Sequence, residues 1–298
     1  MLGEWVMPVR RVFYFLSPFA NENDLKSPEA LIIRQIRLPR ILSAFLTGGI
    51  LSASGIILQG LLSNPMAEPY TLGIASGAAF GASIGILSGV YFVVPSALFG
   101  ALGALFIVKL ISSSGSREKI ILAGIITNAF LSSGVTFIKA IAGEKLYAVV
   151  LWLMGSFAGA DFNDVYRVLT GAFLIFIPGI IYAPYIDVMS LGDERGLILG
   201  INESRVRNIL LFTASAGVAL SVSSFGIIGF VGLIVPHVLR IIIGARHRQL
   251  ILMSFLFGGT LLLFSDGIAQ TAREIPAGVI TALTGAPIFC WLLVKNRS

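Results

Sequence analysis

Few side chains in the apolar parts of this sequence carry groups that could take part in chemistry. Gln59, Asn128, Lys139 and Asp266 are the polar residues that fall within long apolar segments or near their ends. Ionisable groups at such places usually mark routes for ions or protons. Because so few occur here, the sequence argues against a proton-coupled transporter. It argues equally against a membrane enzyme, which needs acids, bases or metal ligands that converge on one site.

Residue types that bind metals or nucleotides are also sparse. His237 and His247 have no paired ligands at metal-site spacing, and we interpret both as loop histidines at the ends of apolar segments. Cys290, the single cysteine, is interpreted as a packing residue. The phosphate-binding pattern G-x-x-x-x-G-K-[ST] does not occur in the sequence, so ATP hydrolysis by this chain is not expected. We therefore predict no catalytic residues, no metal site and no cofactor in this chain.

One long polar stretch, residues 187–207, interrupts the apolar sequence. Within it, 193–199 can form two short helical turns that Gly200 would end. Asn202 can cap a second helix, and Glu203 is favourable in its first turn. Two short helices in a charged loop would form a protrusion suited to docking on a partner. A solvated loop explains the local pattern equally well.

Glycine recurs at a four-residue step in the segment 70–92. A helix places residues at this spacing in one groove, where the backbone of a neighbouring helix can approach closely. Two interpretations remain open: tight packing alone, which we favour, and a helix that lines a moving transport path. The five glycines are Gly73, Gly77, Gly81, Gly85 and Gly89.

The composition indicates what kind of structure holds these residues. Of the 298 residues, 12% are charged and 56% are hydrophobic, whereas a soluble domain carries about 25% charged residues. These values exclude a soluble enzyme, a disulfide scaffold and a disordered chain. The net charge of +6 does not indicate nucleic-acid binding, because the basic residues are spread over short loops and form no run.

Apolar segments that approach the length needed to cross a membrane, about 20 residues, recur along the chain. Lipid offers no partners for free backbone groups, so each segment is predicted to be helical. Segment 229–244 is short and comes almost directly after its predecessor, which gives eight or nine spans. Basic residues on alternate loops of the C-terminal half predict a cytoplasmic C-terminus. The segments are about 41–62, 70–92, 94–113, 119–142, 168–186, 208–228, 229–244, 250–269 and 277–294.

The N-terminal part of the chain does not share this pattern. Its longest apolar run, 12–16, is too short to cross a membrane, and no clear signal-peptide pattern is present. We predict an N-terminal surface segment over 1–36 and one transmembrane domain over 37–298.

Several motifs, spread in order over residues 30–298, are too specific to arise from hydrophobicity alone. Together they resemble the FecCD-type, BtuC-like permeases, which are the membrane subunits of binding-protein-dependent ABC importers for iron–siderophores, haem and cobalamin. The motifs are Arg37-Leu-Pro-Arg40, Asn64-Pro-Met-Ala-Glu-Pro69, Trp152-Leu-Met-Gly-Ser156, Leu191-Gly192 to Gly200, Gly229-Phe-Val-Gly-Leu-Ile-Val-Pro-His237 and Glu274-Ile-Pro-Ala-Gly278.

The resemblance implies an all-α, polytopic bundle of the type II ABC importer permease kind in the cytoplasmic membrane. The family builds ten spans and about nine are found here, because residues 2–40 resemble the stretch that comes after the first span in the family. Either the missing span lies upstream, which we favour, or the chain is a nine-span version of the family. The implied partners are a second permease subunit (homo- or heterodimer), two ABC ATPases that bind ATP–Mg, an extracytoplasmic substrate-binding protein and the lipid bilayer, with no nucleic acid.

The resemblance also implies roles for particular residues. Loop 187–207 becomes the segment that couples to the ATPase, and it contains Gly192, Asp193, Glu194, Arg195, Gly200, Asn202, Glu203 and Arg205. Arg37, Arg40 and Arg273 would dock the binding protein at the outer mouth, with anchoring among lipid headgroups as the alternative for Arg37 and Arg40. The translocation path and its constrictions would involve Gln59, Asn64, Met66, Ala142 and Gly143.

These observations lead to one expected function and one alternative. We expect a permease that carries an iron–siderophore, or haem or cobalamin, into the cytoplasm, with ATP hydrolysed by a separate subunit. The alternative is a secondary transporter or channel that acts alone, against which the scarcity of buried ionisable groups counts.

Overall fold

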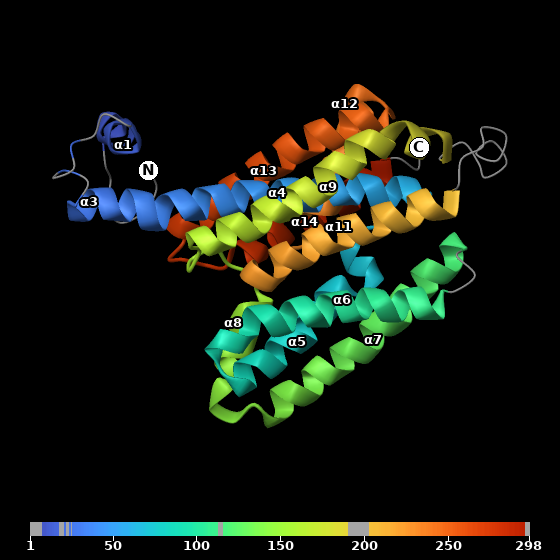
Figure 1. Cartoon of the computed structure of the whole chain (residues 1–298), viewed down its shortest axis with the longest axis horizontal. Helices are drawn as coiled ribbons and strands as arrows, with labels where there is room; N and C mark the ends of the chain where they lie inside the picture. The colour runs from blue at the N-terminus through green and yellow to red at the C-terminus, as the bar shows by residue number, and fades with distance from the viewer. Residues whose placement is uncertain are drawn as a thin grey trace.

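The computed structural model describes residues 8–17, 21, 24, 26–112, 116–189 and 203–295. Within these residues the regular structure is helical, with no strand (Figure 1). The elements in chain order are α1 Val9–Leu16, α3 Pro28–Leu31, the π-helical η1 Ile32–Arg37, α4 Leu38–Leu61, η2 Pro69–Leu72, α5 Ile74–Ser88, η3 Val90–Phe92, α6 Val93–Ile111, α7 Arg117–Ile141, η4 Gly143–Lys145, α8 Leu146–Leu153, α9 Phe162–Met189, α11 Glu203–Phe225, α12 Val231–Ile243, α13 His247–Thr271 and α14 Ala277–Lys295.

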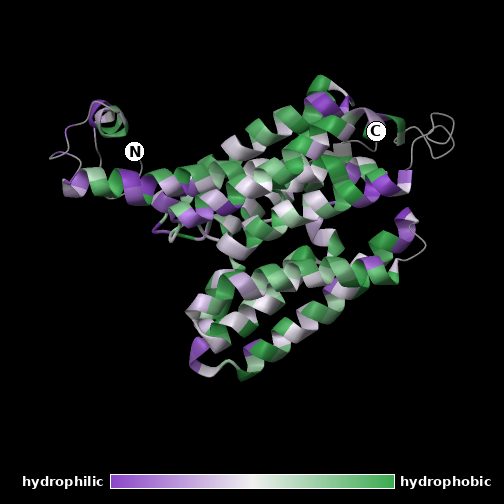
Figure 2. Cartoon of the chain, in the orientation of Figure 1, coloured by the Kyte–Doolittle hydropathy of each residue, from purple (hydrophilic) through white to green (hydrophobic). Residues whose placement is uncertain are grey.

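The described helices match the predicted membrane segments in order. Six helices are long and apolar enough to cross a membrane, and three shorter apolar helices accompany them. Figure 2 shows hydrophobic residues along the middle of the long helices and hydrophilic residues toward their two ends. The predicted all-α, polytopic membrane fold is confirmed. The long helices are 28–61, 93–111, 117–141, 162–189, 203–225 and 247–271, and the shorter ones are 74–88, 231–243 and 277–291.

The first long helix begins well before the predicted segment 41–62. Elements α3, η1 and α4 form one continuous apolar helix from Pro28 to Leu61. Ser27 starts it, since its hydroxyl accepts a hydrogen bond from the backbone N–H of Ala30, and Pro28 occupies the first turn. The predicted segment is shorter because arginines interrupt the apolar run. Tertiary contacts satisfy them, as when the Nε of Arg34 donates to the carbonyl oxygen of Phe15 at 2.8 Å.

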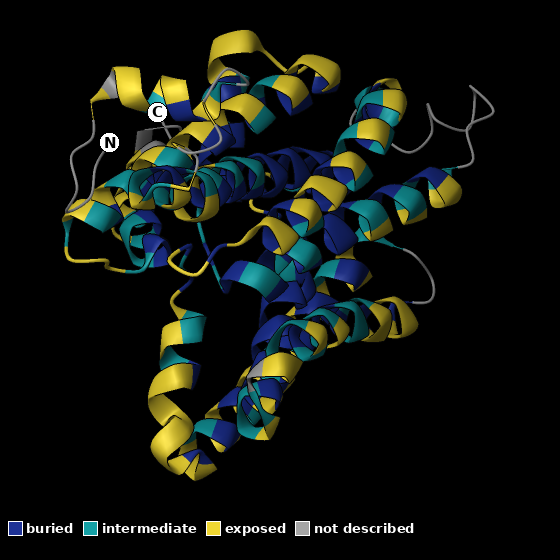
Figure 3. Ribbon diagram, turned by 60° about the vertical axis from the view of Figure 1, so that its left-hand side comes forward, coloured by how far each residue is buried: buried dark blue, intermediate teal, exposed yellow. Residues whose placement is uncertain are grey.

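Helix α4 lies at the centre of the larger group of helices. Most of its residues are buried, and α9, α11, α12 and α13 all pack against it (Figures 1 and 3). A helix that is buried on every side needs small residues where neighbours cross. A Cβ added at Gly48 would lie less than 3.0 Å from the backbone of Gly258 in α13, and one at Gly55 would meet Gly232 of α12 in the same way.

The middle members of the four-residue glycine series lie in α5, where they allow the closest approach of a neighbouring backbone. Cβ atoms at Gly77, Gly81 and Gly85 would come within 3.0 Å of the backbone of residues 92–100, in η3 and α6. Gly73 and Gly89 have positive φ angles of 83° and 141° and stand at the two ends of α5. They stop the helix, so it covers 74–88 rather than the predicted 70–92.

Helices α5, α6, α7 and α8 form a second layer beside the group around α4 (Figure 1). The layer is held to that group mainly by α11, which packs on α6 and α5. The chain passes from α4 into the layer through residues 62–73, called the 62–73 connection below. It returns through residues 154–161 after α8. Polar side chains of the connection, α5 and α7 line a cavity where the connection meets the layer.

Candidate functional site

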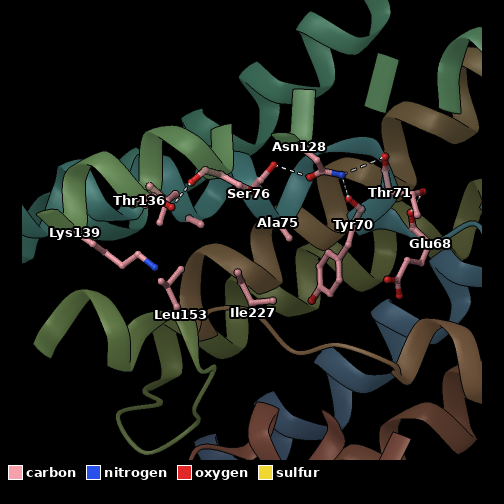
Figure 4. Close-up of a pocket in the computed structure, with 13 residues that line it drawn as sticks. Glu68, Tyr70, Thr71, Ala75, Ser76, Asn128, Thr136, Lys139, Leu153 and Ile227 are labelled. Atoms are coloured by element: carbon pink, nitrogen blue, oxygen red, sulfur yellow. Dashed lines mark hydrogen bonds between the residues drawn. The ribbon is translucent and has the colours of Figure 1, made fainter. Parts of the chain in front are cut away.

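A cavity of about 580 Å³ opens between the 62–73 connection, α5 and α7 (Figure 4). Its wall alternates hydroxyl and amide groups with small apolar side chains, and it carries one acid and one amine. Such a surface can pass a large polar solute without trapping it at a single strong site. The lining residues are Glu68, Tyr70, Thr71, Ala75, Ser76, Ala79, Asn128, Ser132, Val135, Thr136, Lys139, Leu153 and Ile227.

Asn128 joins three elements of the cavity wall. Its Nδ2 donates to the carbonyl oxygen of Tyr70 at 2.8 Å, and its Oδ1 accepts from the hydroxyl of Ser76 at 2.7 Å. These bonds tie η2 and α5 to the middle of α7 (Figure 4). An amide suits this place because it donates and accepts at once.

Tyr70 ties the same wall to the chain between α11 and α12. Its hydroxyl donates to the carbonyl oxygen of Ile228 at 2.7 Å and accepts from the N–H of Ile228 at 3.1 Å. The backbone of residues 226–230 has left the helical path, with positive φ angles at Gly226 and Phe230. Side-chain bonds of this kind satisfy backbone groups that a broken helix leaves open.

The two ionisable groups of the cavity lie at opposite ends of it. Lys139 comes from the last turn of α7, and Glu68 comes from the 62–73 connection (Figure 4). Burial raises the pKa of Glu68 to about 7. This carboxyl therefore changes charge near neutral pH, at the end of the cavity away from Lys139.

The raised pKa of Glu68 predicts a pH-dependent stability. A carboxyl whose pKa is higher in the folded chain than in the unfolded chain stabilises the fold below its unfolded pKa. That contribution is lost as the pH rises from the ordinary glutamate pKa of 4.5 through about 7. The unfolding temperature in detergent should decrease from about pH 5 to about pH 8, and this decrease should be smaller in Glu68→Gln. Glu144→Gln, which changes an exposed acid, is the control and should show the same decrease as the wild type. A decrease in Glu68→Gln as large as in the wild type would contradict the prediction.

None of the five predicted path residues is among those that line the cavity, and two of them are buried. Gln59 is buried inside α4 with 3% of its surface exposed, and its Nε2 donates to the carbonyl oxygen of Gly232 in α12 at 3.2 Å. Its amide bridges two packed helices, and a role for Gln59 in the path stays a prediction. Ala142 is buried as well.

The other predicted path residues are more accessible. Met66 is exposed in the 62–73 connection, and its backbone N–H is held by the Oδ1 of Asn64 at 2.9 Å. Gly143 is exposed at the start of η4 and has a φ of 53°. The short helices η4 and α8, which come next in the chain, were not predicted because 146–153 is too short to register as a membrane segment.

At the predicted outer mouth, Arg40 is paired with acids of its own chain. Its guanidinium forms a bidentate pair with Asp266 of α13, with Nε–Oδ2 and Nη2–Oδ1 distances of 2.8 and 2.9 Å. Its Nη1 also donates to Glu274 at 3.0 Å. Arg40 is buried and its charge is paired within the chain, and its role in docking a partner stays a prediction. Arg37 is half-buried and Arg273 is exposed.

The opposite end of the bundle holds the charged residues that flank the predicted coupling loop. Gly192, Asp193, Glu194, Arg195, Gly200 and Asn202 lie outside the described residues. Glu203 begins α11, where the Nη1 of Arg207 donates to its Oε1 at 3.2 Å and Arg117 lies 3.7 Å from the same atom. Arg205 is exposed.

The interpretation of both histidines as loop residues is wrong. His237 lies inside α12, and His247 is the first residue of α13 with 4% of its surface exposed. The Nδ1 of His247 lies 2.6 Å from the Oδ1 of Asp187, in the last turn of α9. The imidazole of His247 packs directly against the backbone of Gly60 in α4. A Cβ at position 60 would come within 3.0 Å of the ring.

Sequence reasoning misses three residues that shape the site. Glu68 and Tyr70 stand in or beside the motif at 64–69, which points only to Asn64 and Met66. Arg117 counts in the sequence only as one of several basic residues that set orientation. The sequence does contain one indication of Glu68: it is an acid in a chain with few acids, and it comes directly before Pro69 and Tyr70.

A membrane bundle with a cavity of mixed polar and apolar lining in one layer is compatible with a transport protein. The chain belongs to the FecCD transport family, whose family model matches residues 1–295.

Individual relatives agree with this assignment. The chain is 37% identical to a "Probable iron chelatin transport system permease protein" of Helicobacter pylori, covering 92% of this chain and 86% of the relative. It is 38% identical to a cobalamin import system permease of Halobacterium salinarum, covering 88% and 73%. A solved structure of a metal-chelate-type ABC transporter in an inward-facing conformation matches with a TM-score of 0.86 and 32% identity, over 95% of this chain and 94% of that chain.

Proposed function

We propose that this chain is the permease subunit of an ABC importer that carries an anionic iron chelate, such as an iron–siderophore, into the cytoplasm. Membership of the FecCD transport family supports the class of protein, and relatives named for iron chelate and cobalamin transport support a metal chelate as cargo. The single observation that carries the proposal is the cavity of about 580 Å³ between the 62–73 connection, α5 and α7.

The size and wall of the cavity suit half of a path for a large solute. Pockets for drug-sized ligands measure about 300–1,000 Å³, so the cavity alone is small for a whole metal chelate. A second permease subunit that faced the same wall would enlarge the path. The hydroxyl and amide groups are committed to the protein's own backbone, as Asn128 and Thr136 show. They would offer a passing solute weak contacts.

The charge of the cavity favours an iron chelate over a neutral corrinoid. Lys139 places an amine at the end of the cavity nearer the predicted outer side, where substrate would enter. Iron chelates built on carboxylates or catechols commonly carry negative charge, and an amine at the entrance would attract them. Haem shares this property through its carboxylates and remains within the proposed substrate class.

The proposed partners are those that this role requires. Two ATPase subunits would bind ATP–Mg, and one would engage loop 187–207. A substrate-binding protein would dock at the opposite end, where Arg37 and Arg273 remain candidates. We place the complex in the cytoplasmic membrane, and it has no part in nucleic-acid binding.

Uptake by reconstituted vesicles tests the proposal. The permease would be assembled with the ATPase and binding protein encoded nearest to it, and radiolabelled ferric citrate and cobalamin would be offered in parallel. We expect ATP-dependent uptake of the ferric chelate, a several-fold loss in Lys139→Gln, and no loss in Lys119→Gln, whose lysine is exposed at the start of α7. Uptake without the ATPase, driven by a proton or sodium gradient, would establish a secondary transporter instead.

A further inference from the structure

Arg117 is the first residue of α7, and its guanidinium contacts three other parts of the chain. Its Nη1 donates to the hydroxyl of Ser63, directly after α4. Its Nη2 donates to the carbonyl oxygen of Met189, the last residue of α9, at 3.2 Å. The same Nη2 lies 3.7 Å from the Oε1 of Glu203, the first residue of α11. The side chain is 15% exposed, so these contacts are made largely out of water.

Two of these contacts are made to residues inside the predicted coupling loop 187–207. Met189 and Glu203 are the described residues on either side of 190–202. One guanidinium therefore joins two described parts of that loop. Arg207 fixes the carboxylate of Glu203 from a second side, so the acid is shared by two arginines and keeps its place.

The remaining connections of Arg117 lead to the cavity. Helix α7 supplies Asn128 and Lys139 to the cavity wall, and it starts at Arg117. Ser63 belongs to the 62–73 connection, which supplies Glu68 and Tyr70. A displacement of residues 189 and 203 would thus be passed to two elements of the wall through one planar group.

We propose that Arg117 is the positioning residue through which a displacement of Met189 and Glu203, in the predicted coupling loop 187–207, reaches the wall of the cavity. The inference rests on the proposed function, in which that loop meets the ATPase. Arginine suits the role because its rigid fork of donors can hold three acceptors at fixed angles, whereas a lysine amine is a single point of charge. Coupling of this kind requires a packed element that both sites bias.

The test compares the amount of solute taken up for each ATP hydrolysed by the complete complex in vesicles. Arg117→Ala should keep ATP hydrolysis within about two-fold of the wild type but lower uptake per ATP by at least about ten-fold, because the three contacts that pass the movement on are lost. Arg117→Lys should lower uptake per ATP nearly as much, because a lysine amine keeps the charge but cannot reach all three acceptors as the guanidinium does. Lys119→Gln, on the same turn but exposed, should match the wild type.

Ser63→Ala provides a milder variant if Arg117→Ala fails to fold. It removes one of the three contacts and leaves the ion pair with Glu203, so uptake per ATP should fall several-fold with normal assembly. A proportional loss of ATP hydrolysis and uptake in both variants would show that Arg117 only holds the fold, and would overturn the inference. So would unchanged uptake per ATP.

The two proposals fail in different ways. A wild-type complex that takes up neither ferric citrate nor cobalamin with ATP would contradict the proposed function. Wild-type uptake that persists at full efficiency in the Arg117 variants would contradict the inference alone.

Discussion

Asp266→Ala should destabilise the folded protein by about 3–5 kcal/mol, the usual cost of removing one partner from a buried ion pair. The side chain of Asp266 is 2% exposed and that of Arg40 is 11% exposed. Removing the carboxylate would leave the guanidinium of Arg40 enclosed among helices, with only the surface acid Glu274 to balance its charge. We expect little folded protein to be recovered in detergent, with a strongly lowered unfolding temperature.

Two further variants test whether the destabilisation comes from leaving Arg40 buried without a partner or simply from removing a charge near it. Glu274→Gln should cost no more than about 1 kcal/mol, because Glu274 is 57% exposed and its pair with Arg40 is screened by water. The double variant Arg40→Met/Asp266→Leu should recover most of the stability, since it removes both charges together. An Asp266→Ala protein as stable as Glu274→Gln would contradict the assignment.

Gly100→Ala should separate α5 from α6. A Cβ at Gly100 would lie less than 3.0 Å from the carbonyl oxygen of Gly77, and neither backbone can yield without moving its helix. Overpacking of a tight contact costs about 1–3 kcal/mol and occasionally more. Since α5 and α6 support the cavity wall, we expect a lower unfolding temperature together with reduced uptake.

A matched control lies on the same helix. A Cβ at Gly103 would meet nothing within 4 Å. Gly103→Ala should therefore be neutral or stabilising by up to about 1 kcal/mol, because alanine favours the helix. Equal unfolding temperatures for Gly100→Ala and Gly103→Ala would show that the close approach of α5 and α6 is not what holds the layer together.

The helices of this protein can be predicted because composition alone decides them. In lipid the backbone must satisfy itself, so each apolar segment has to be a helix. Their ends are less predictable, because they depend on contacts made elsewhere in the fold. The helix that begins at Pro28 contains Arg34 and Arg40, and both are tolerated only through partners at Phe15 and Asp266.

The site shows the same division. The motif at 64–69 points to the correct connection, yet it does not distinguish the exposed Met66 from the cavity-lining Glu68. Gln59 and Arg40 are predicted to have outward roles because polar residues in apolar helices suggest function. In the fold they serve the packing of α4 on α12 and α13. Sequence pattern alone does not tell which neighbour a polar side chain meets.

The central position of α4 has a consequence for how the chain is made. Ser43, Thr47 and Ser52 are buried in α4, and its Gly48 and Gly55 are covered by the backbones of α13 and α12. These partners are synthesised long after α4, as Arg40 and Asp266 stand 226 residues apart. Until α13 has entered the membrane, α4 presents hydroxyls, bare backbone and an arginine to lipid. A chain that ends before α13 therefore leaves the polar groups of α4 exposed to lipid. We expect membrane proteases that degrade misfolded proteins to recognise such a truncated chain through α4.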